Sequence, residues 1–426
     1  MDSEIKIDRV VVVNDFSVAR GGATSLVLDL ILGLVDLGYK VTFITGDRGE
    51  NKSIVDLGVE VIALSGNRLL DSSPIDRIKN GFFWKEAEST IRAWISANDT
   101  SNTVYHVHGW AQILSIAVFS ALKPVSRRTV IHAHDAFLLC PNGGFIDYRK
   151  KSVCHLRPLS QACLLTNCDK RNMMNKVWRV ARTFSLNRII DDLENWGCVV
   201  LIADQMKLWF ERSGVVQTRL TVIPNPSRPF TSERVKCEDN STFFYIGRVT
   251  ESKGVAEFLS ACSIAGVQCE VIGDGDQRAE LEKKYMRIKF HGWKSHEEIG
   301  EILKSARAVV VPSIMPEPFG LVIVEALKSG VPVVLSNNAL LAALVKKRGG
   351  GVSFNSGDIE GLCGILEALR DMSNLKVKKQ SVQAMRTGNE LSPSHQNSVR
   401  DVVKVYQGVI GSSHDSGERV FLYAVQ

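Results

Sequence analysis

Short runs of β-branched and aromatic residues alternate with longer stretches of helical periodicity along most of the chain. In the first half these apolar runs lie at 10–13, 39–45, 59–64, 103–108, 128–134, 198–203 and 219–224. In the second half they lie at 241–247, 267–273, 287–292, 306–312, 331–336 and 351–355. Strands that are apolar throughout are buried on both faces, so the alternation predicts parallel sheets covered by helices on each side. We therefore expect an α/β fold.

The alternation is interrupted by a polar, turn-like segment at 224–241 and then starts again. A chain of 426 residues is too long for one ordinary core, since a domain holds about 200 residues. We therefore expect two Rossmann-like, doubly wound domains that face a central cleft. Their predicted bounds are 1–226, with a cysteine-bearing insert at 140–170, and 238–390, followed by a C-terminal helical region and tail at 391–426. Ligands bind at the carboxyl ends of the strands in such sheets, so residues just after each strand are the candidates.

Composition and charge narrow the function classes. The net charge of +6 is small for this length and does not indicate nucleic-acid binding. The N-terminal stretch MDSEIKIDRVVVV has early acidic residues and a short apolar run, so it does not resemble a signal peptide. The most apolar segment, LVLDLILGLVDLG, is too short and too charged to span a bilayer. We expect a cytoplasmic protein, with peripheral contact to the inner face of the plasma membrane left open.

Two kinds of strand end stand out in the first half. Gly21 and Gly22 precede a helix, where the backbone can approach a ligand closely and the helix N-terminus favours an anion. A plain turn explains them equally well. Two strands end in histidine pairs, the second being His132 and His134, followed by Asp135. His134 can be a proton-handling group in the cleft or a strand-end residue bonded to backbone, and a zinc site is a third interpretation that no HExxH motif supports.

The second half contains a more specific pattern. In YIGRVTESKG, a strand is followed by Gly247 and Arg248, and then by Lys253 at the start of a helix. Two cations beside a helix N-terminus form a physically sensible diphosphate site, although a solvated loop is the alternative. Gly273 in VIGDGD marks another strand-end turn. It is not part of a GxGxxG motif, so the dinucleotide fingerprint is missing.

The segment MPEPFGLVIVEALKSG places two glutamates eight positions apart. Glu317 lies in the loop after a strand, Gly320 and Leu321 open a helix, and Glu325 falls in the second turn. The predicted packing face of this helix consists of Val322, Ile323, Ala326 and Leu327. On this pattern Glu325 can line the cleft, since another face of the helix consists of Leu321, Val324, Glu325 and Lys328. Carboxylates accept hydrogen bonds, which vicinal sugar hydroxyls donate well.

These motifs together resemble the retaining glycosyltransferases of family 4, also called glycosyl transferases group 1, which have the GT-B fold. The family signature of two glutamates separated by seven residues is matched by EPFGLVIVE, and its GR…KG segment by Gly247 to Gly254. VIPNP, the Gly-Gly loop and the His134–Asp135 pair match three more family elements in the same order. The resemblance covers nearly the whole chain and is strongest in the second half. It is to the bacterial polysaccharide and lipopolysaccharide type.

The resemblance implies a role for each matching residue. Arg248 and Lys253 would bind the donor diphosphate and stabilise its developing charge without a required metal. Glu317 would bind the donor sugar hydroxyls, Glu325 the ribose hydroxyls, and His134 would lie near the reacting sugar. The remaining expected donor-site residues are Gly21, Gly22, Gly247, Gly273, Phe319, Gly320 and Leu321. The family's glycine loop often continues with an acidic residue, whereas here it reads Gly-Gly-Ala-Thr, which puts acceptor contact there in doubt.

Two segments are not explained by the shared motifs. Cys140, Cys154, Cys163 and Cys168 lie within the insert. They can form a structural zinc site, but no CxxC pair supports one, and buried free thiols are the alternative. The stretch 170–190 carries six cations and no acid. It can be a helix that contacts a membrane surface or an ordinary packed helix with a basic outer side.

We therefore expect a glycosyltransferase that moves a sugar from a nucleotide diphosphate sugar to an acceptor hydroxyl with retention of configuration. It would need no cofactor and no metal. The acceptor would be a glycan or a lipid-linked glycan in cell-surface polysaccharide or lipopolysaccharide synthesis, and the C-terminal helix would cross back to the first domain. A GT-B epimerase and a non-catalytic sugar-nucleotide binding protein are the alternatives. The sequence does not determine the donor base, the sugar, the acceptor, the linkage or the oligomeric state.

Overall fold

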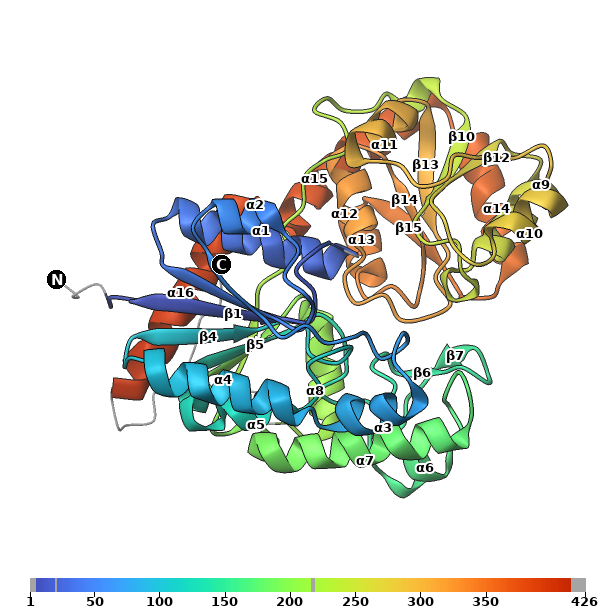
Figure 1. Ribbon diagram of the computed structural model, residues 1–426. Coiled ribbons are helices and arrows are strands. Elements are labelled where there is room, and N and C mark those ends of the chain that lie inside the picture. The colour runs from blue at the N-terminus through green and yellow to red at the C-terminus, as the bar shows by residue number, and fades with distance from the viewer. Residues whose placement is uncertain (1–4, 20, 216–218, 415–426) are drawn as a thin grey trace. The chain divides into compact units, whose positions relative to one another are not determined.

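The structure is a computed structural model that describes residues 5–19, 21–215 and 219–414. The chain divides into two compact units (Figure 1). Unit 1 comprises Met1–Phe145, His155–Ile223 and His395–Gln426, and unit 2 comprises Ile146–Cys154 and Pro224–Ser394. The part of the expected C-terminal tail beyond residue 414 lies outside the described residues.

Unit 1 is built on a seven-stranded parallel sheet. In spatial order its strands are β3 (Glu60–Ala63), β2 (Val41–Thr45), β1 (Arg9–Asn14), β4 (Thr103–Val107), β5 (Thr129–Ala133), β8 (Cys198–Leu201) and β9 (Leu220–Val222). The strand order reverses between β1 and β4, which defines the topological switch point of the sheet.

Helices cover both faces of this sheet (Figure 1). The α-helices of unit 1 among the described residues are α1 (Gly22–Asp36), α2 (Lys52–Asp56), α3 (Pro74–Phe82), α4 (Lys85–Asn98), α5 (Ala117–Leu122), α6 (Gln161–Leu165), α7 (Met173–Ile190), α8 (Lys207–Ser213) and α16 (His395–His414). Apolar residues of α1 and α16 form one core with alternate residues of the central strands. On the opposite face Tyr105 of β4 packs edge-to-face on Trp94 of α4, with ring centroids 6.5 Å apart. The strands are therefore buried on both sides, as their continuous apolar sequence predicts.

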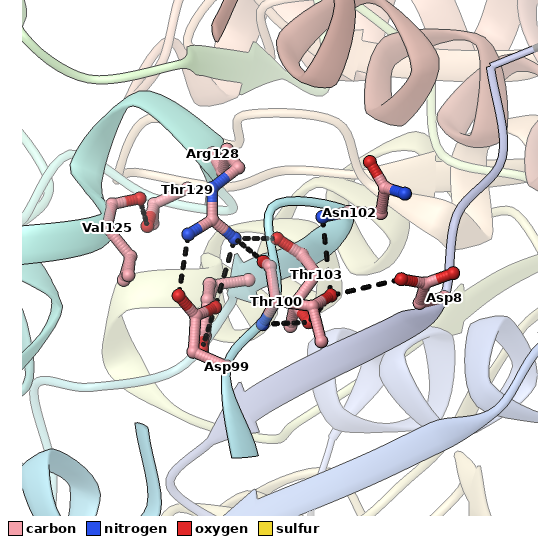
Figure 2. A network of polar contacts seen from close by, with 9 residues as sticks. Asp8, Asp99, Thr100, Asn102, Thr103, Val125, Arg128 and Thr129 are labelled. Carbon is pink, nitrogen blue, oxygen red and sulfur yellow. Dashed lines mark hydrogen bonds and ion pairs between the residues drawn. The ribbon is translucent and has the colours of Figure 1, made fainter. Parts of the chain in front are cut away.

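A polar network ties the amino ends of β4 and β5 together (Figure 2). Arg128 pairs with Asp99 through two hydrogen bonds, of 2.7 and 3.0 Å, and donates to the carbonyls of Thr100 and Thr103. The Thr100 hydroxyl donates to Asp8, 3.2 Å away. A planar guanidinium suits such a fork, so one side chain fixes the loop that leads into β4. This network lies at the opposite end of the strands from the switch-point residues that follow them.

Unit 2 repeats the design with a six-stranded parallel sheet. Its strands in spatial order are β12 (Lys289–Phe290), β11 (Cys269–Ile272), β10 (Thr242–Ile246), β13 (Ala306–Val311), β14 (Val333–Ser336) and β15 (Gly351–Phe354). Taken in chain order within the unit this is the 3-2-1-4-5-6 arrangement of a doubly wound sheet. Unit 2 also holds a small antiparallel hairpin of β6 (Ile146–Asp147) and β7 (Ser152–Val153).

The helices of unit 2 lie on both sides of its sheet (Figure 1). They are α9 (Val255–Ala265), α10 (Arg278–Lys284), α11 (His296–Leu303), α12 (Leu321–Lys328), α13 (Ala342–Arg348), α14 (Ile359–Arg370) and α15 (Asn374–Leu391). α9 and α14 share one core with the strands, while α12 and α15 pack together. α11 starts with a capping box, in which the Ser295 hydroxyl and the Glu298 carboxylate each accept a backbone N–H.

The prediction of an α/β fold with parallel sheets is confirmed. Among the described residues, the helices include none with the length and apolar character needed to cross a bilayer.

Candidate functional site

The first candidate site lies at the switch point of unit 2, where β10 and β13 end. Lys253 and Glu317, from the loops that follow these two strands, form an ion pair. The Ser313 hydroxyl also donates to the Glu317 carboxylate, 3.4 Å away. Both charged side chains keep about a fifth of their surface exposed, 23% for Lys253 and 20% for Glu317. The pair is thus accessible to a polar ligand.

Close backbone contacts hold these two loops together. Gly254 has a φ of +70°, and a Cβ at this position would lie 2.1 Å from the Pro312 carbonyl oxygen. Only glycine fits such a left-handed, crowded position. The Ile314 N–H donates to the Ser252 carbonyl, 3.0 Å away. The glycine expected in the GR…KG segment therefore brings the Lys253 loop against the loop that leads to Glu317.

The backbone of Glu317 is clamped from the other side by the segment after β14. The Glu317 N–H donates to the Asn338 carbonyl, and the Leu340 N–H donates to the Glu317 carbonyl, both at 3.0 Å. The Asn338 side chain also donates to the Ile314 carbonyl, 2.6 Å away. The position of the carboxylate is therefore fixed by three chain segments.

The helix that follows, α12, begins at Leu321 with Gly320 as its N-cap, as predicted. Gly320 has a φ of +72°, and Phe319 is buried beside it. The first turn of a helix has backbone N–H groups without intrahelical partners, which favour an anionic ligand. This helix start follows Glu317 by four positions, so the carboxylate and the helix N-terminus belong to one loop.

Glu325 lies in the second turn of α12 and faces a partner that sequence reasoning missed. Its carboxylate is 3.7 Å from Nε2 of His296, the first residue of α11. The His296 ring packs on Phe230, with centroids 4.7 Å apart. The Glu325 side chain is 16% exposed. Only the capping sequence around Ser295 places His296 at a helix start, and nothing in the sequence links it to Glu325.

The predicted packing face of α12 was partly wrong. Val324 is completely buried and Val322 is only partly buried, the reverse of the expectation. Lys328 is also buried, with its ammonium donating to the carbonyls of Ser227 at 2.6 Å and Pro393 at 3.3 Å. α12 is packed on more than one side, so a simple amphipathic pattern underestimates its burial.

Arg248 and the glycine turns complete this region. Arg248 is exposed, and no ion-pair partner for it is present among the residues that the structure describes. Its carbonyl accepts a hydrogen bond from the Tyr245 hydroxyl, 2.6 Å away. A Cβ at Gly273 would lie 1.8 Å from the Gly247 carbonyl oxygen, so the turns after β10 and β11 touch through backbone alone. The structure thus brings Lys253 and Glu317 into contact and places Gly247, Arg248 and Gly273 beside each other.

The second candidate site is a pocket at the switch point of unit 1. Its lining comes from the ends of β1, β4 and β5 and from the start of α1: Asn14, Asp15, Phe16, Ala23, Thr24, His108, Gly109, Trp110, Ala111, Gln112, His132, Ala133, His134, Asp135, Phe137 and Leu138. Gly21 is the N-cap of α1 and Gly22 its first residue, so the two predicted glycines start the helix that reaches this pocket.

Four histidines from β4 and β5 lie together beside the pocket. His108 Nδ1 is 3.0 Å from His134 Nε2, and His132 Nδ1 is 3.3 Å from His106 Nε2. His106 Nδ1 is hydrogen-bonded to the hydroxyl of Tyr406 on α16, 2.7 Å away. Burial lowers the pKa of His134 to about 4 and those of the other three well below the ordinary value, so all four imidazoles are neutral near pH 7.

Two charged residues position the pocket and were missed in the sequence. The buried Asp15 carboxylate accepts the N–H groups of Gln112, Ile113 and Leu114 at 2.8 to 2.9 Å. Arg182 on α7 donates to the Ala111 carbonyl at 3.2 Å, and burial lowers the pKa of Arg182 to about 10. Asp15 directly follows β1, so the expectation that site residues follow the strands would have identified it. Arg182 gave no such signal.

The cysteines of the insert form no disulfide, and neither do the other cysteines that the structure describes. Within unit 1, Cys163 and Cys168 lie 3.5 and 3.1 Å from the ammonium of Lys176, which is 1% exposed. Among the described residues, the group that could share a metal ion consists of His106, His108 and His132, without any of the four insert cysteines. Cys163 and Cys168 therefore lie against a buried lysine.

Comparison with known proteins agrees with this description. Residues 228–383 match the family model of glycosyl transferases group 1. An uncharacterized glycosyltransferase of Methanocaldococcus jannaschii, MJ1607, is 24% identical over 263 residues, which cover 58% of this chain and 61% of that protein. The lipopolysaccharide core biosynthesis glycosyltransferase LpsE of Rhizobium meliloti is 29% identical over 140 residues, 31% of this chain and 40% of that protein. The chain thus spans only about half the length of these curated relatives.

Solved structures show the same fold at low sequence identity. Sucrose-phosphate synthase from Thermosynechococcus elongatus has a TM-score of 0.69 at 17% identity, covering 95% of this chain and 100% of that one. Anabaena HepE, solved with UDP and glucose, has a TM-score of 0.63 at 16% identity, covering 94% and 99%. These likenesses confirm the GT-B class of α/β fold. Residues 228–383 thus resemble the glycosyl transferases group 1 family, and over the rest of the chain the likeness to solved structures is one of fold.

Proposed function

We propose that this protein transfers a sugar from a nucleotide diphosphate sugar to an acceptor hydroxyl, with retention of configuration and without a metal at the diphosphate. The observation that carries the proposal is the pairing of Lys253 with Glu317 at the switch point of unit 2, four residues before the N-terminus of α12. This arrangement puts a cation, a carboxylate and free N–H groups within one ligand-sized region.

Each group has a chemical task in this proposal. Lys253 and Arg248 hold the diphosphate and stabilise the negative charge that develops as the sugar bond breaks. Glu317 exchanges its contact with Lys253 for hydrogen bonds from sugar hydroxyls, and Glu325 accepts those of the ribose. HepE was solved with UDP and glucose, which supports a nucleoside diphosphate sugar as the donor class.

The acceptor side of the reaction belongs to the pocket of unit 1. His134, with its Nδ1 buried and unpaired in the described structure, can hydrogen-bond a sugar oxygen as a neutral imidazole. Departure of the diphosphate followed by attack from the same face would give retention, and it needs positioning and charge stabilisation more than a strong base. The relative LpsE, from lipopolysaccharide core synthesis, supports a cell-surface glycan as the acceptor.

An exposed apolar surface suggests where a lipid-linked acceptor would be met. α3 and α7 are joined by Trp178, which packs on Phe82 and donates to the Ile78 carbonyl. Large apolar side chains on these helices are well exposed: Ile75 77%, Ile78 62%, Met174 82%, Val177 58% and Phe184 52%. With the exposed cations Lys170, Arg171 and Arg188, this surface suits the headgroup region of an anionic membrane.

A vesicle experiment tests this membrane contact. The protein should co-sediment with vesicles containing anionic lipid at low salt and less at high salt, and Met174→Glu should weaken binding. Leu208→Glu changes another residue of unit 1 that is 64% exposed and lies on α8, so it should leave binding intact. Equal binding by both variants and wild type, or no binding by any, would remove the membrane from the proposal.

Donor binding and turnover are tested separately. A thermal-shift screen of nucleotide diphosphate sugars should reveal the donor, because a ligand that binds the native state raises its stability. Turnover by wild type and Lys253→Met is then compared, with Lys304→Met, an exposed surface lysine of unit 2, as the matched control. Loss of about 10²- to 10³-fold in rate by Lys253→Met alone supports charge stabilisation.

The same screen separates the alternatives. A non-catalytic binding protein would show a thermal shift but no transfer to any acceptor. An epimerase would interconvert donor sugars without releasing nucleoside diphosphate. Unchanged turnover by Lys253→Met would reject the proposed mechanism whichever donor is found.

A further inference from the structure

We propose that His106, His108 and His132 form a binding site for a divalent transition metal inside unit 1. One ring nitrogen from each of the three lies within 4.8 Å of the others, and the three side chains are 0%, 6% and 8% exposed. His106 lies in β4, His108 directly follows it, and His132 lies in the neighbouring parallel strand β5, so the sheet itself brings them together. The site would be independent of the donor site in unit 2 and of its proposed charge stabilisation.

The spacing of two of the nitrogens suits a shared metal ion. His106 Nε2 and His132 Nδ1 are 3.3 Å apart. With Zn–N bonds of about 2.0–2.1 Å in a tetrahedral site, two imidazole ligands are separated by roughly 3.3–3.4 Å. The rings of His106 and His132 are also near parallel, at 23°, with centroids 5.3 Å apart. The separation of these two nitrogens is therefore already that of two ligands of one ion, and the rings need only tilt to direct their lone pairs at it.

Tyr406 prepares His106 for this role. Its hydroxyl is 2.7 Å from His106 Nδ1 and lies on α16, which packs against the sheet. When His106 Nδ1–H donates to this hydroxyl, Nε2 keeps the lone pair that a metal needs. Metal-ligating histidines usually donate their other ring N–H in this way, which fixes the tautomer and the ring orientation.

His108 supplies the third ligand and a route from the pocket. Its Nε2 is buried and has no hydrogen-bond partner in the described structure. The His108 ring lies 4.0 Å from that of His106 and 4.8 Å from that of His132, centroid to centroid. Both His108 and His132 line the pocket. An ion can enter from that side, and the pocket leaves room for a water molecule or ligand oxygen as a fourth ligand.

The chemistry of the donor set selects the kind of metal. Three neutral imidazoles suit Zn²⁺, Co²⁺, Ni²⁺ or Cu²⁺, whereas Mg²⁺ and Ca²⁺ prefer carboxylate, carbonyl and water oxygens. A metal on His108 Nε2 would also fix His108 with a proton on Nδ1, which donates to His134 Nε2 at 3.0 Å. His134 Nε2 would then accept this hydrogen bond, so His134 would carry its own proton on Nδ1 although it does not bind the ion.

Cobalt binding tests the site without any substrate. Co²⁺ is titrated into the chelator-treated full chain, and visible absorption and calorimetry report coordination and stoichiometry. We expect one equivalent per chain, with the absorption of a low-coordinate nitrogen site and no sulfur-to-cobalt charge-transfer band. His132→Gln should abolish this binding, and Tyr406→Phe, which keeps the histidines, should weaken it by about 10- to 100-fold.

The insert cysteines provide the matched control. The double variant Cys163→Ser, Cys168→Ser should bind Co²⁺ like the wild type. Equal binding by His132→Gln and wild type, a sulfur-to-cobalt band, or no binding at micromolar Co²⁺ by the folded wild-type chain would each overturn the proposal. Circular dichroism shows whether His132→Gln is folded. A folded Tyr406→Phe variant that binds Co²⁺ with unchanged affinity would also contradict the proposed metal site. No outcome depends on donor turnover, so failure of this site leaves the proposed transferase function standing.

Discussion

The ammonium of Lys253 and the carboxylate of Glu317 form an ion pair although 64 positions separate them in the chain. The contact exists because β10 and β13 are neighbours in the sheet of unit 2, and each residue lies in the loop after one of these strands. The strand order of the sheet, more than either local sequence, therefore brings the two charges together. A donor that binds here must share or replace this contact.

Disrupting this pair should affect transfer far more than stability. Both side chains are partly exposed, and such ion pairs contribute about 0–1 kcal/mol to stability. Lys253→Met and Glu317→Gln should therefore each change the free energy of unfolding by less than about 1 kcal/mol, measured by urea titration. In the transfer assay Lys253→Met should lower kcat/KM by about 10²- to 10³-fold, because charge-stabilising groups contribute about 3–4 kcal/mol in the transition state. Glu317→Gln should lower it by about 10- to 100-fold, because a hydrogen bond to a charged group contributes about 1.5–3 kcal/mol.

A double-variant cycle shows whether the two residues act on the same ligand. If Lys253 binds the diphosphate and Glu317 the sugar of one donor, the double variant should lose less than the product of the single losses. Strict multiplication of the two effects would mean that they act independently. A large loss of stability in either single variant would instead indicate a structural ion pair.

Glu325 should discriminate ribose from deoxyribose. A hydrogen bond to a charged group contributes about 1.5–3 kcal/mol, so Glu325→Gln should weaken binding of the nucleoside diphosphate by about 10- to 100-fold. Calorimetry with the 2′-deoxy nucleoside diphosphate checks the cause. The wild type should bind this analogue more weakly than the ribose form, whereas Glu325→Gln should bind the two forms with nearly equal affinity. Glu301→Gln, an exposed glutamate on α11, is the control. An unchanged ribose preference in Glu325→Gln would contradict this role.

His296 shows why the sequence predicted only part of this site. The two glutamates could be recognised from their spacing, because a loop followed by a helix fixes their relation locally. The 3.7 Å contact between His296 and Glu325 depends on where α11 lies relative to α12, which no local pattern encodes. The alternation of strands and helices likewise predicted the α/β fold, since continuous apolar strands need cover on both faces.

The burial of α12 and the grouping of the histidines could not be derived in the same way. Lys328 was expected on another face than the packing residues, but its ammonium donates to two carbonyls inside unit 2. His106 and His132 come from strands whose register depends on pairing in the sheet, and their partner Tyr406 is 300 positions from His106. Such long-range contacts follow from tertiary packing.

The buried Lys176 should control the reactivity of the thiols around it. Contact with Cys168 and nearby thiols raises the pKa of Lys176 in spite of the opposing effect of burial, and an ammonium in such a position favours a thiolate beside it. Lys176→Met should therefore slow native-state alkylation of Cys168, measured by peptide mass spectrometry. Cys198, whose pKa burial raises to about 11, should react equally slowly in both proteins.

Stability gives a second measure of the same contact. Because an apolar side chain of similar length removes the cost of burying the ammonium, Lys176→Met should change the free energy of unfolding by no more than about 1 kcal/mol or increase it. A loss of several kcal/mol, or faster alkylation of Cys168, would contradict a lysine that acts mainly on the thiols.

Acid should destabilise unit 2 through Glu238. Arg234 binds this carboxylate with two hydrogen bonds, of 2.7 and 2.9 Å, and lowers the pKa of Glu238 to about 2 from its ordinary 4.5. Because the unfolded chain takes up this proton more readily, the stabilisation is complete above about pH 5 and is lost as the pH falls from 4.5 to 2. The loss should approach about 3 kcal/mol. Urea unfolding at several pH values measures this dependence.

Glu238→Gln should reduce the dependence of the free energy of unfolding on pH and lower that free energy by about 1–3 kcal/mol at pH 7. The control is Glu390→Gln, which changes a more exposed pair with Arg348 and should lower the free energy of unfolding by less than about 1 kcal/mol. An equal pH dependence in wild type and Glu238→Gln would show that other carboxylates cause the acid transition.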